Sequence, residues 1–167
     1  MKLFGKWQRD EAPAGDDKPA FAADTPILPI GKNRKVLVVD DNPVVLKSFE
    51  LKLKASGFEV LTATEGAAAV SLARQTRPDL IVLDINFPPD VGSSGLQWDG
   101  FNIVQWLRRF QDAADIPIII VSAGESGKYK EKSLAAGAVA FFQKPIKYEE
   151  FMSTISQALT PKEKAPE

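Results

Sequence analysis

The chain has 167 residues, enough for one domain of ordinary size but short for two. Apolar residues make up 44% of it and charged residues 26%, as in a globular protein with one core. The formal net charge is -1, so no basic surface would attract nucleic acid, and we expect none to bind. Cysteine and histidine are absent, which excludes disulfides, thiol catalysis, a Ser-His-Asp triad and metal sites built on thiolate or imidazole. Any metal would be held by oxygen, which favours ions such as Mg²⁺.

The two ends of the chain are predicted to be flexible tails. Residues 1–33 mix charges, prolines and glycines with scattered apolar residues, and residues 161–167 form another frayed end. The alternative for Met1–Arg9 is a short helix that presents three large side chains to a partner or a membrane: Leu3, Phe4 and Trp7. No apolar run reaches the ~20 residues that span a bilayer, and the opening MKLFGKWQRD lacks the apolar stretch of a secretory signal. We therefore expect a cytoplasmic protein without a membrane span.

Residues 34–160 alternate between short β-branched runs and segments with helical spacing of apolar residues, and they are expected to form one domain. In chain order, the expected elements are a strand at Val36–Val39, a helix from Pro43 to about Ser56, a strand at Val60–Ala63, a helix from Ala67 to about Gln75, a strand at Leu80–Leu83, a helix at Gly100–Phe110, a strand at Ile118–Val121, a helix at Lys128–Ala136, a strand at Val139–Phe142 and a helix at Tyr148–Leu159. This alternation predicts an α/β fold, a doubly wound five-stranded parallel sheet with helices on both faces.

Polar residues follow the predicted strands where each strand ends. Asp40 and Asp41 follow the first strand, Asp84 the third, Ser122 the fourth and Lys144 the fifth. In a doubly wound sheet, ligands bind outside the carboxyl ends of the strands, so these side chains are expected to converge. Each of them taken alone also fits a helix cap, a turn or a surface charge. Three carboxylates together repel one another unless a cation or protons are bound, which favours a divalent-cation site.

Four segments resemble the receiver domain of two-component response regulators. They are VLVVDDNP at 36–43, LIVLDINFP at 80–88, IIIVSA at 118–123 and FFQKPI at 141–146. Together they cover residues 34–160 in the order of that family. The resemblance implies a flavodoxin-like sheet with strand order 2-1-3-4-5. It also implies a single-domain, chemotaxis-type receiver without an attached output domain.

The resemblance also assigns roles to the residues at the strand ends. Asp84 would accept a phosphoryl group from a phosphohistidine and help to hold Mg²⁺. Asp41 would coordinate that ion directly, Asp40 would do so through a water, and the backbone carbonyl of Asn86 would be a further ligand. Lys144 would pair with a phosphoryl oxygen. The chain would be no enzyme in the ordinary sense, because it would catalyse only its own phosphorylation and dephosphorylation.

Two further features follow from the resemblance. Ser122 would donate its hydroxyl to the phosphoryl group, and Phe141, where Tyr is common in the family, would turn inward as the second half of a switch. The peptide bond between Lys144 and Pro145 would be cis, as in the family. The alternative for Phe141 is a simple core residue.

The resemblance and the absence of histidine together define the expected partners. Since the chain has no histidine, the donor would be a separate sensor kinase or histidine phosphotransfer protein. A downstream protein would bind the face made by the fourth helix, fifth strand and fifth helix, and a homodimer is possible. The candidate contacts on that face are Tyr129, Lys130, Phe142 and Tyr148.

The segment after Asp84 departs from the family pattern. The Asp-Gly pair that usually follows closely is found only at Asp99-Gly100, after FPPDVGSSGLQW, an insertion of about eight residues beyond common loop lengths. The Gly-Ser-Ser-Gly centre is expected to be mobile, with Leu96 and Trp98 able to dock beside the site. A tolerated surface insertion is one interpretation, and a partner-selecting loop or partial lid is the other.

Other classes of protein fit less well. A pseudo-receiver used as a scaffold would be expected to lack Asp41, Asp84 or Lys144, and all three are present. A phosphatase of the haloacid-dehalogenase type would need a second Asp where Asn86 stands. A flavodoxin-like cofactor binder would not place acids after its first strand, and the motif of a P-loop NTPase is missing.

Overall fold

The protein folds around a five-stranded parallel sheet with the order β2-β1-β3-β6-β7, which confirms the predicted fold. The computed structural model describes residues 30–86, 90–91, 97–98, 100–124 and 126–160. Residues 1–29 and 161–167 of the predicted tails lie outside these residues, whereas residues 30–33 form a turn in which the N–H of Gly31 donates to the carbonyl of Ser56. The sheet strands are β1 (Lys35–Val39), β2 (Glu59–Ala63), β3 (Leu80–Asp84), β6 (Ile118–Ser122) and β7 (Ala140–Gln143). The helices are α1 (Pro43–Ala55), α2 (Gly66–Thr76), α3 (Gly100–Leu107), α4 (Ser126–Ala135) and α5 (Tyr148–Leu159).

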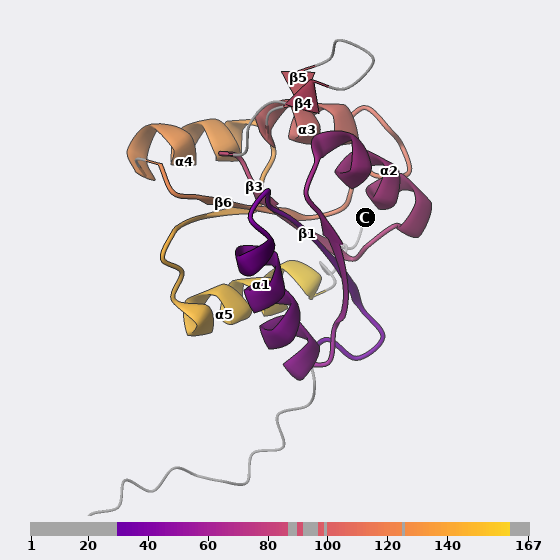
Figure 1. Cartoon of the computed structure of the whole chain (residues 1–167), viewed down its shortest axis with the longest axis vertical. Helices are drawn as coiled ribbons and strands as arrows, with labels where there is room; N and C mark the ends of the chain where they lie inside the picture. The colour runs from indigo at the N-terminus through magenta and orange to yellow at the C-terminus, as the bar shows by residue number, and fades with distance from the viewer. Residues whose placement is uncertain (1–29, 87–89, 92–96, 99, 125, 161–167) are drawn as a thin grey trace, which may run out of the picture.

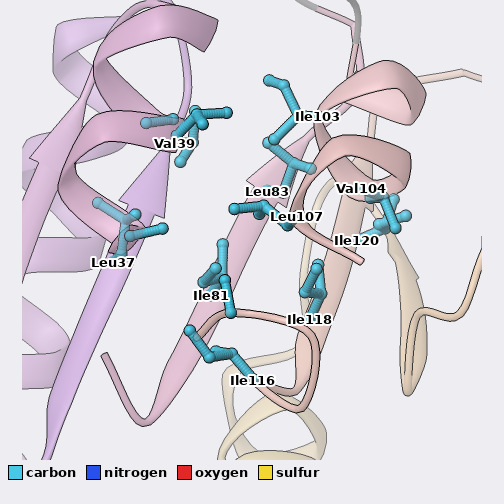
Figure 2. Close-up of a cluster of buried hydrophobic side chains, with 14 of the residues drawn as sticks. Leu37, Val39, Ile81, Leu83, Ile103, Val104, Leu107, Ile116, Ile118 and Ile120 are labelled. Carbon is cyan, nitrogen blue, oxygen red and sulfur yellow. The ribbon is translucent and has the colours of Figure 1, made fainter. Parts of the chain in front are cut away.

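Helices cover both faces of the sheet, with α1 and α5 on one side and α2, α3 and α4 on the other (Figure 1). Successive residues of a strand point to opposite faces, so Val36 and Val38 pack toward α1 and α5 while Leu37 and Val39 pack toward α2 and α3. Figure 2 shows the cluster on the α2–α3 side. Because strands β1, β3 and β6 are buried on both faces, they are apolar except at Lys35, where β1 begins, and at Asp84 and Ser122, where β3 and β6 end.

The helix boundaries follow local signals. The Asn42 side chain caps α1 by accepting a hydrogen bond from the backbone N–H of Val44, and Pro43 occupies the first turn. Helix α3 ends at Leu107 rather than at the predicted Phe110, because the N–H groups of residues 109 and 110 bond three residues back and tighten the chain into turns. None of the described helices is long and apolar enough to cross a membrane.

The insertion after β3 contains a short antiparallel hairpin that was not predicted. Its strands are β4 (Asp90–Val91) and β5 (Gln97–Trp98). The expected mobile centre and the expected docking of Leu96 and Trp98 concern positions and side chains outside the described parts of the chain. Where α3 begins, Gly100 packs so closely on Ile85 that a Cβ at position 100 would overlap the Cα of Ile85. The chain therefore returns from the insertion beside the residue that follows Asp84.

At the opposite end of the sheet, Arg108 joins three segments. Its guanidinium donates hydrogen bonds to the backbone carbonyls of Ala114, Ile116 and Gly137. Burial lowers the pKa of Arg108, and the charge of Asp115 opposes that shift. The side chain thus ties the end of α3 to the segment that leads into β6 and to the turn after α4.

Candidate phosphoacceptor site

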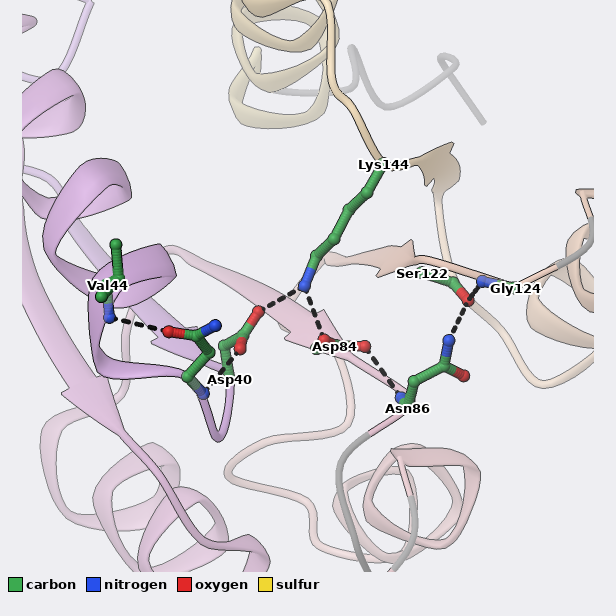
Figure 3. A network of polar contacts seen from close by, with 8 residues as sticks. Asp40, Val44, Asp84, Asn86, Ser122, Gly124 and Lys144 are labelled. Carbon is green, nitrogen blue, oxygen red and sulfur yellow. Dashed lines mark hydrogen bonds and ion pairs between the residues drawn. The ribbon is translucent and has the colours of Figure 1, made fainter.

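The strand-end residues that the sequence singled out meet at one edge of the sheet (Figure 3). Parallel strands end at the same edge, so Asp40 after β1, Asp84 at the end of β3 and Ser122 at the end of β6 become neighbours. Their exposed fractions are only 2%, 5% and 0%. Asp41 is exposed at the mouth of the site. The predicted convergence of these residues is confirmed.

Lys144 bridges the two buried carboxylates. Its Nζ lies 2.6 Å from Oδ2 of Asp40 and 2.7 Å from Oδ2 of Asp84. The peptide bond between Lys144 and Pro145 is cis, as the family resemblance implied. The ammonium group therefore lies between the two buried carboxylates. The sequence predicted only that Lys144 would pair with a phosphoryl oxygen.

The pKa values of Asp40 and Lys144 are both shifted by burial and by the interactions within the site. Burial raises the pKa of Asp40, and the charge of Asp84 adds to the rise, while hydrogen bonds from Lys144 and from the N–H of Asn42 act against it. Burial alone would lower the pKa of Lys144, but hydrogen bonds and charges from Asp40 and Asp84 outweigh it and raise that pKa. The site therefore holds its carboxylates at a cost that further positive charge would relieve.

Three carboxylates form a group that fits a divalent cation. One oxygen each from Asp40, Asp41 and Asp84 lies within 4.8 Å of the others. The three carboxylates carry three negative charges and Lys144 supplies one positive charge, so two negative charges are left. Carboxylate oxygens are the ligands that Mg²⁺ prefers. The donor set and the remaining charge both suit such an ion.

Asn86 connects Asp84 to Ser122 through its side chain, a contact that the sequence did not reveal. Its backbone N–H donates to Oδ1 of Asp84 at 2.8 Å, and its amide lies 2.9 Å from Oγ of Ser122. The N–H groups of Ala123 and Gly124 also point at the amide, which favours the orientation with the amide oxygen turned toward them. The sequence analysis assigned a role only to the backbone carbonyl of Asn86, as a metal ligand. A contact between side chains on two different loops leaves no pattern in the sequence.

The aromatic residues assigned to the switch and output face lie in different surroundings. Phe141 is half-buried against the α2–α3 cluster. Phe142 and Tyr148 pack on the α1–α5 side, where the Tyr148 hydroxyl donates to the carbonyl of Lys52. Lys130 is exposed, whereas Tyr129 is half-buried, turned toward α3 and stacked on Phe101 with ring centroids 6.3 Å apart.

Comparison with known proteins agrees with this geometry. The model of the response regulator receiver domain matches residues 36–156. The chain belongs to the response regulator receiver family. It is therefore a receiver domain of two-component signalling, and the acidic pocket of such domains generally binds Mg²⁺.

Individual relatives fall into two length classes. The chain is 41% identical over 125 residues to the transcriptional regulatory protein PrrA of Mycobacterium leprae, covering 75% of this chain and 49% of that protein. The chain thus spans about half the length of the PrrA proteins that it matches. It is 32% identical to the polar-differentiation response regulator DivK of Brucella anthropi, covering 75% of this chain and 96% of DivK.

Solved structures show the same fold. The chemotaxis protein CheY4 of Vibrio cholerae superposes with a TM-score of 0.66 at 29% identity, covering 75% of this chain and 98% of that one. A putative response regulator from Chloroflexus aurantiacus gives a TM-score of 0.69 at 26% identity, covering 78% and 100%. The receiver segment is thus similar to whole single-domain receivers as well as to part of longer regulators.

Proposed function

We propose that this receiver accepts a phosphoryl group on Asp84 from a phosphohistidine of a sensor kinase or histidine phosphotransfer protein in the cytoplasm. The observation that carries the proposal is the pairing of a buried carboxylate, Asp84, with the ammonium of Lys144 and with the Asn86–Ser122 hydrogen bond beside it. A nucleophile, a cation and a hydroxyl group thereby lie together at one edge of the sheet. Such fixed groups are what a reaction that proceeds by positioning and charge stabilisation requires.

In the proposed transfer, an oxygen of the Asp84 carboxylate bonds to phosphorus as the bond from phosphorus to the histidine nitrogen breaks. The imidazole keeps the electron pair of that bond. Lys144 then exchanges its contact with Asp84 for a phosphoryl oxygen, and Ser122 donates its hydroxyl to another. The chain performs only this reaction and the hydrolysis that reverses its effect, so we do not class it as an enzyme.

Asp40, Asp41 and Asp84, with the backbone carbonyl of Asn86, would hold Mg²⁺. When bound, the ion would offset the charge of the carboxylates and of the transferring oxygens. Asp41 is the exposed member of the group, so it is open to solvent and to an arriving ion. Its exchange for Asn should weaken phosphorylation without disturbing the buried ion pair of Lys144.

Another protein would bind the receiver in its phosphorylated form. We propose that the face made by α4, β7 and α5 binds the downstream target and that Phe141 takes part in the switch, with Ser122 as its partner. Lys130 is exposed on that face, and so are the large apolar side chains of Leu134 and Val139. A homodimer through the same face is an alternative use of it.

The test is incubation with Mg²⁺ and a small-molecule phosphodonor, followed by intact-mass measurement. We expect the wild type to gain one phosphoryl group, the gain to vanish in Asp84→Asn, and a chelator to suppress it. The matched control is Asp115→Asn, an exposed acid at the other end of the sheet, which should be phosphorylated like the wild type. No gain in the wild type would instead favour an unphosphorylated receiver that serves as a scaffold.

A further inference from the structure

Gly124 has no side chain for a spatial reason rather than a conformational one. Among the described glycines, positive φ angles occur at Gly57 and Gly137 but not at Gly124, so the backbone of Gly124 suits other residues. A Cβ at position 124 would lie 2.6 Å and 3.0 Å from two ring carbons of Tyr129. The same Cβ would lie 3.4 Å from Oγ of Ser122. The ring of Tyr129 therefore occupies the place beside the Ser122 hydroxyl that a side chain at 124 would take.

Tyr129 is held in this place from two elements. Its ring stacks on Phe101 of α3 with an angle of 14° between the planes, and Phe101 is itself only 7% exposed. Lys132 of α4 places its Nζ 4.0 Å from the centroid of the Phe101 ring. The Ser133 hydroxyl donates to the carbonyl of Tyr129. Helix α3 in turn starts against Ile85, so the ring is fixed relative to the acceptor strand.

Hydrogen bonds connect Gly124, the residue beside this ring, to Asp84. The N–H of Gly124 donates to Oγ of Ser122 at 3.0 Å, and that oxygen lies 2.9 Å from the Asn86 amide. The backbone of Asn86 bonds to Asp84. Gly124 therefore lies between the ring and the Ser122 hydroxyl, and that hydroxyl is joined to Asp84 through Asn86. The ring presents apolar surface at the Ser122 side of the site.

We infer that Tyr129 is a positioning residue that forms the wall of the phosphoacceptor site on the Ser122 side and slows hydrolysis of the acyl phosphate. This inference rests on the proposed phosphorylation of Asp84. In the hydrolysis, a water oxygen bonds to phosphorus while the bond from phosphorus to the Asp84 oxygen breaks. The carboxylate keeps that electron pair, and both water protons leave with inorganic phosphate. An apolar wall reduces the space open to that water.

The first test measures first-order loss of phosphate from purified phosphorylated protein after the donor is removed. Tyr129→Ala opens the wall, so we expect decay about fivefold faster or more. Tyr129→Phe keeps the ring and should decay at the wild-type rate. The matched control is Glu131→Ala, a truncation of an exposed residue of the same helix, which should also decay like the wild type. Unfolding temperatures of all variants, recorded in parallel, separate the effect on decay from an effect on stability.

The second test uses the shared space directly. In the Tyr129→Ala background, Gly124→Leu should refill the wall and bring the decay rate back toward the wild-type value. In the wild-type background, the same Gly124→Leu change would clash with the ring and should not slow decay. Rescue in one background and not in the other is a result that loss of packing alone does not produce.

Several outcomes would overturn the inference. Decay in Tyr129→Ala that is unchanged or slower would show that the ring is no barrier to water. A change in Tyr129→Phe as large as that in Tyr129→Ala would assign the effect to the hydroxyl instead. If the wild type takes up no phosphoryl group at all, it is the proposed acceptor role of Asp84 that fails, and mass spectrometry reveals this before any decay is measured.

Discussion

At the scale of single residues, the site is held together by one cation among three acids. Asp40 is almost fully buried, and its pKa is raised above the ordinary value mainly by burial. A carboxyl group with a higher pKa in the folded than in the unfolded state binds its proton more tightly when folded. Stability then falls as the pH rises through that pKa, so the ionised form is a net cost at pH 7. The ion pair with Lys144 only partly offsets this cost.

Asp40→Asn should therefore stabilise the protein when divalent cations are absent. We expect its free energy of unfolding to rise in the presence of a chelator, because the cost of burying the charge is removed while Lys144 keeps its pair with Asp84. Adding Mg²⁺ at ten times its dissociation constant should stabilise the wild type by about 1.4 kcal/mol, and the variant by less at the same concentration. Urea denaturation with and without Mg²⁺ measures both. Glu59→Gln, which alters an exposed acid on β2, serves as the control. A loss of stability in chelator would show instead that the pair with Lys144 is net favourable.

Much of the site at this scale was predictable, because each acid follows a strand and the strand ends meet. The side-chain bridge from Asn86 to Ser122 was not predictable, since it depends on how two loops face each other. The position of Tyr129 was likewise hidden. A Tyr four residues into a helix and a Gly after a strand form no sequence pattern, and only the packing of α4 on α3 brings them together.

At the scale of elements, Arg108 is the clearest case of one side chain holding several segments. Arg108→Ala removes donors from three backbone carbonyls and should lower the free energy of unfolding by about 2–3 kcal/mol. Arg108→Lys should recover only part of the loss, because an ammonium cannot reproduce the planar fork of donors. Arg109→Ala, at the exposed neighbouring position, should change stability by no more than about 0.5 kcal/mol. Urea denaturation decides this, and equal losses for Ala at 108 and 109 would contradict the proposed clamp.

The insertion between β3 and α3 is the other element with a testable role. If it acts as a partial lid over the site, deletion of Val91–Trp98 should speed loss of the phosphoryl group from Asp84, by about threefold or more. The unfolding temperature should change little, since the two described strands of the insertion pair with each other and not with the main sheet. An unchanged decay rate would rule out the lid. If transfer from a kinase changes instead, the partner-selecting interpretation is the correct one.

Element prediction succeeded where periodicity was strong and failed where it was absent. The five sheet strands are long enough for an apolar run to show, and the Val and Ile residues of β1, β3 and β6 are typical of a buried parallel sheet. The hairpin strands are two residues each, too short for any period to appear. The sequence predicts that α3 ends at Phe110, because Phe110 continues the apolar spacing. The helix ends at Leu107, where the backbone turns.

At the scale of the whole molecule, two cores share one sheet. Leu53 of α1 belongs to the cluster on one face and Leu107 of α3 to the cluster on the other, and both are essentially inaccessible. Neither cluster is closed without the sheet that separates them. We therefore expect the two faces to unfold together.

Leu53→Ala and Leu107→Ala should each lower the free energy of unfolding by about 2–5 kcal/mol. Each variant should still unfold in a single transition, with far-UV circular dichroism and tryptophan fluorescence giving the same midpoint. Transitions that separate in one variant and not in the other would show that one layer is independently stable.

The close approach of Gly100 to Ile85 has a consequence for how such a protein can acquire new parts. The backbone leaves the edge of the sheet that carries Asp84 after Asn86 and returns beside Ile85, so the spacing of the site does not depend on what lies between. Each doubling of the length of that excursion costs only about 0.6 kcal/mol of closure entropy. The position is thus a permissive graft point, where a recognition peptide or a reporter domain would sit within a few residues of the acceptor while the framework beneath stays unchanged.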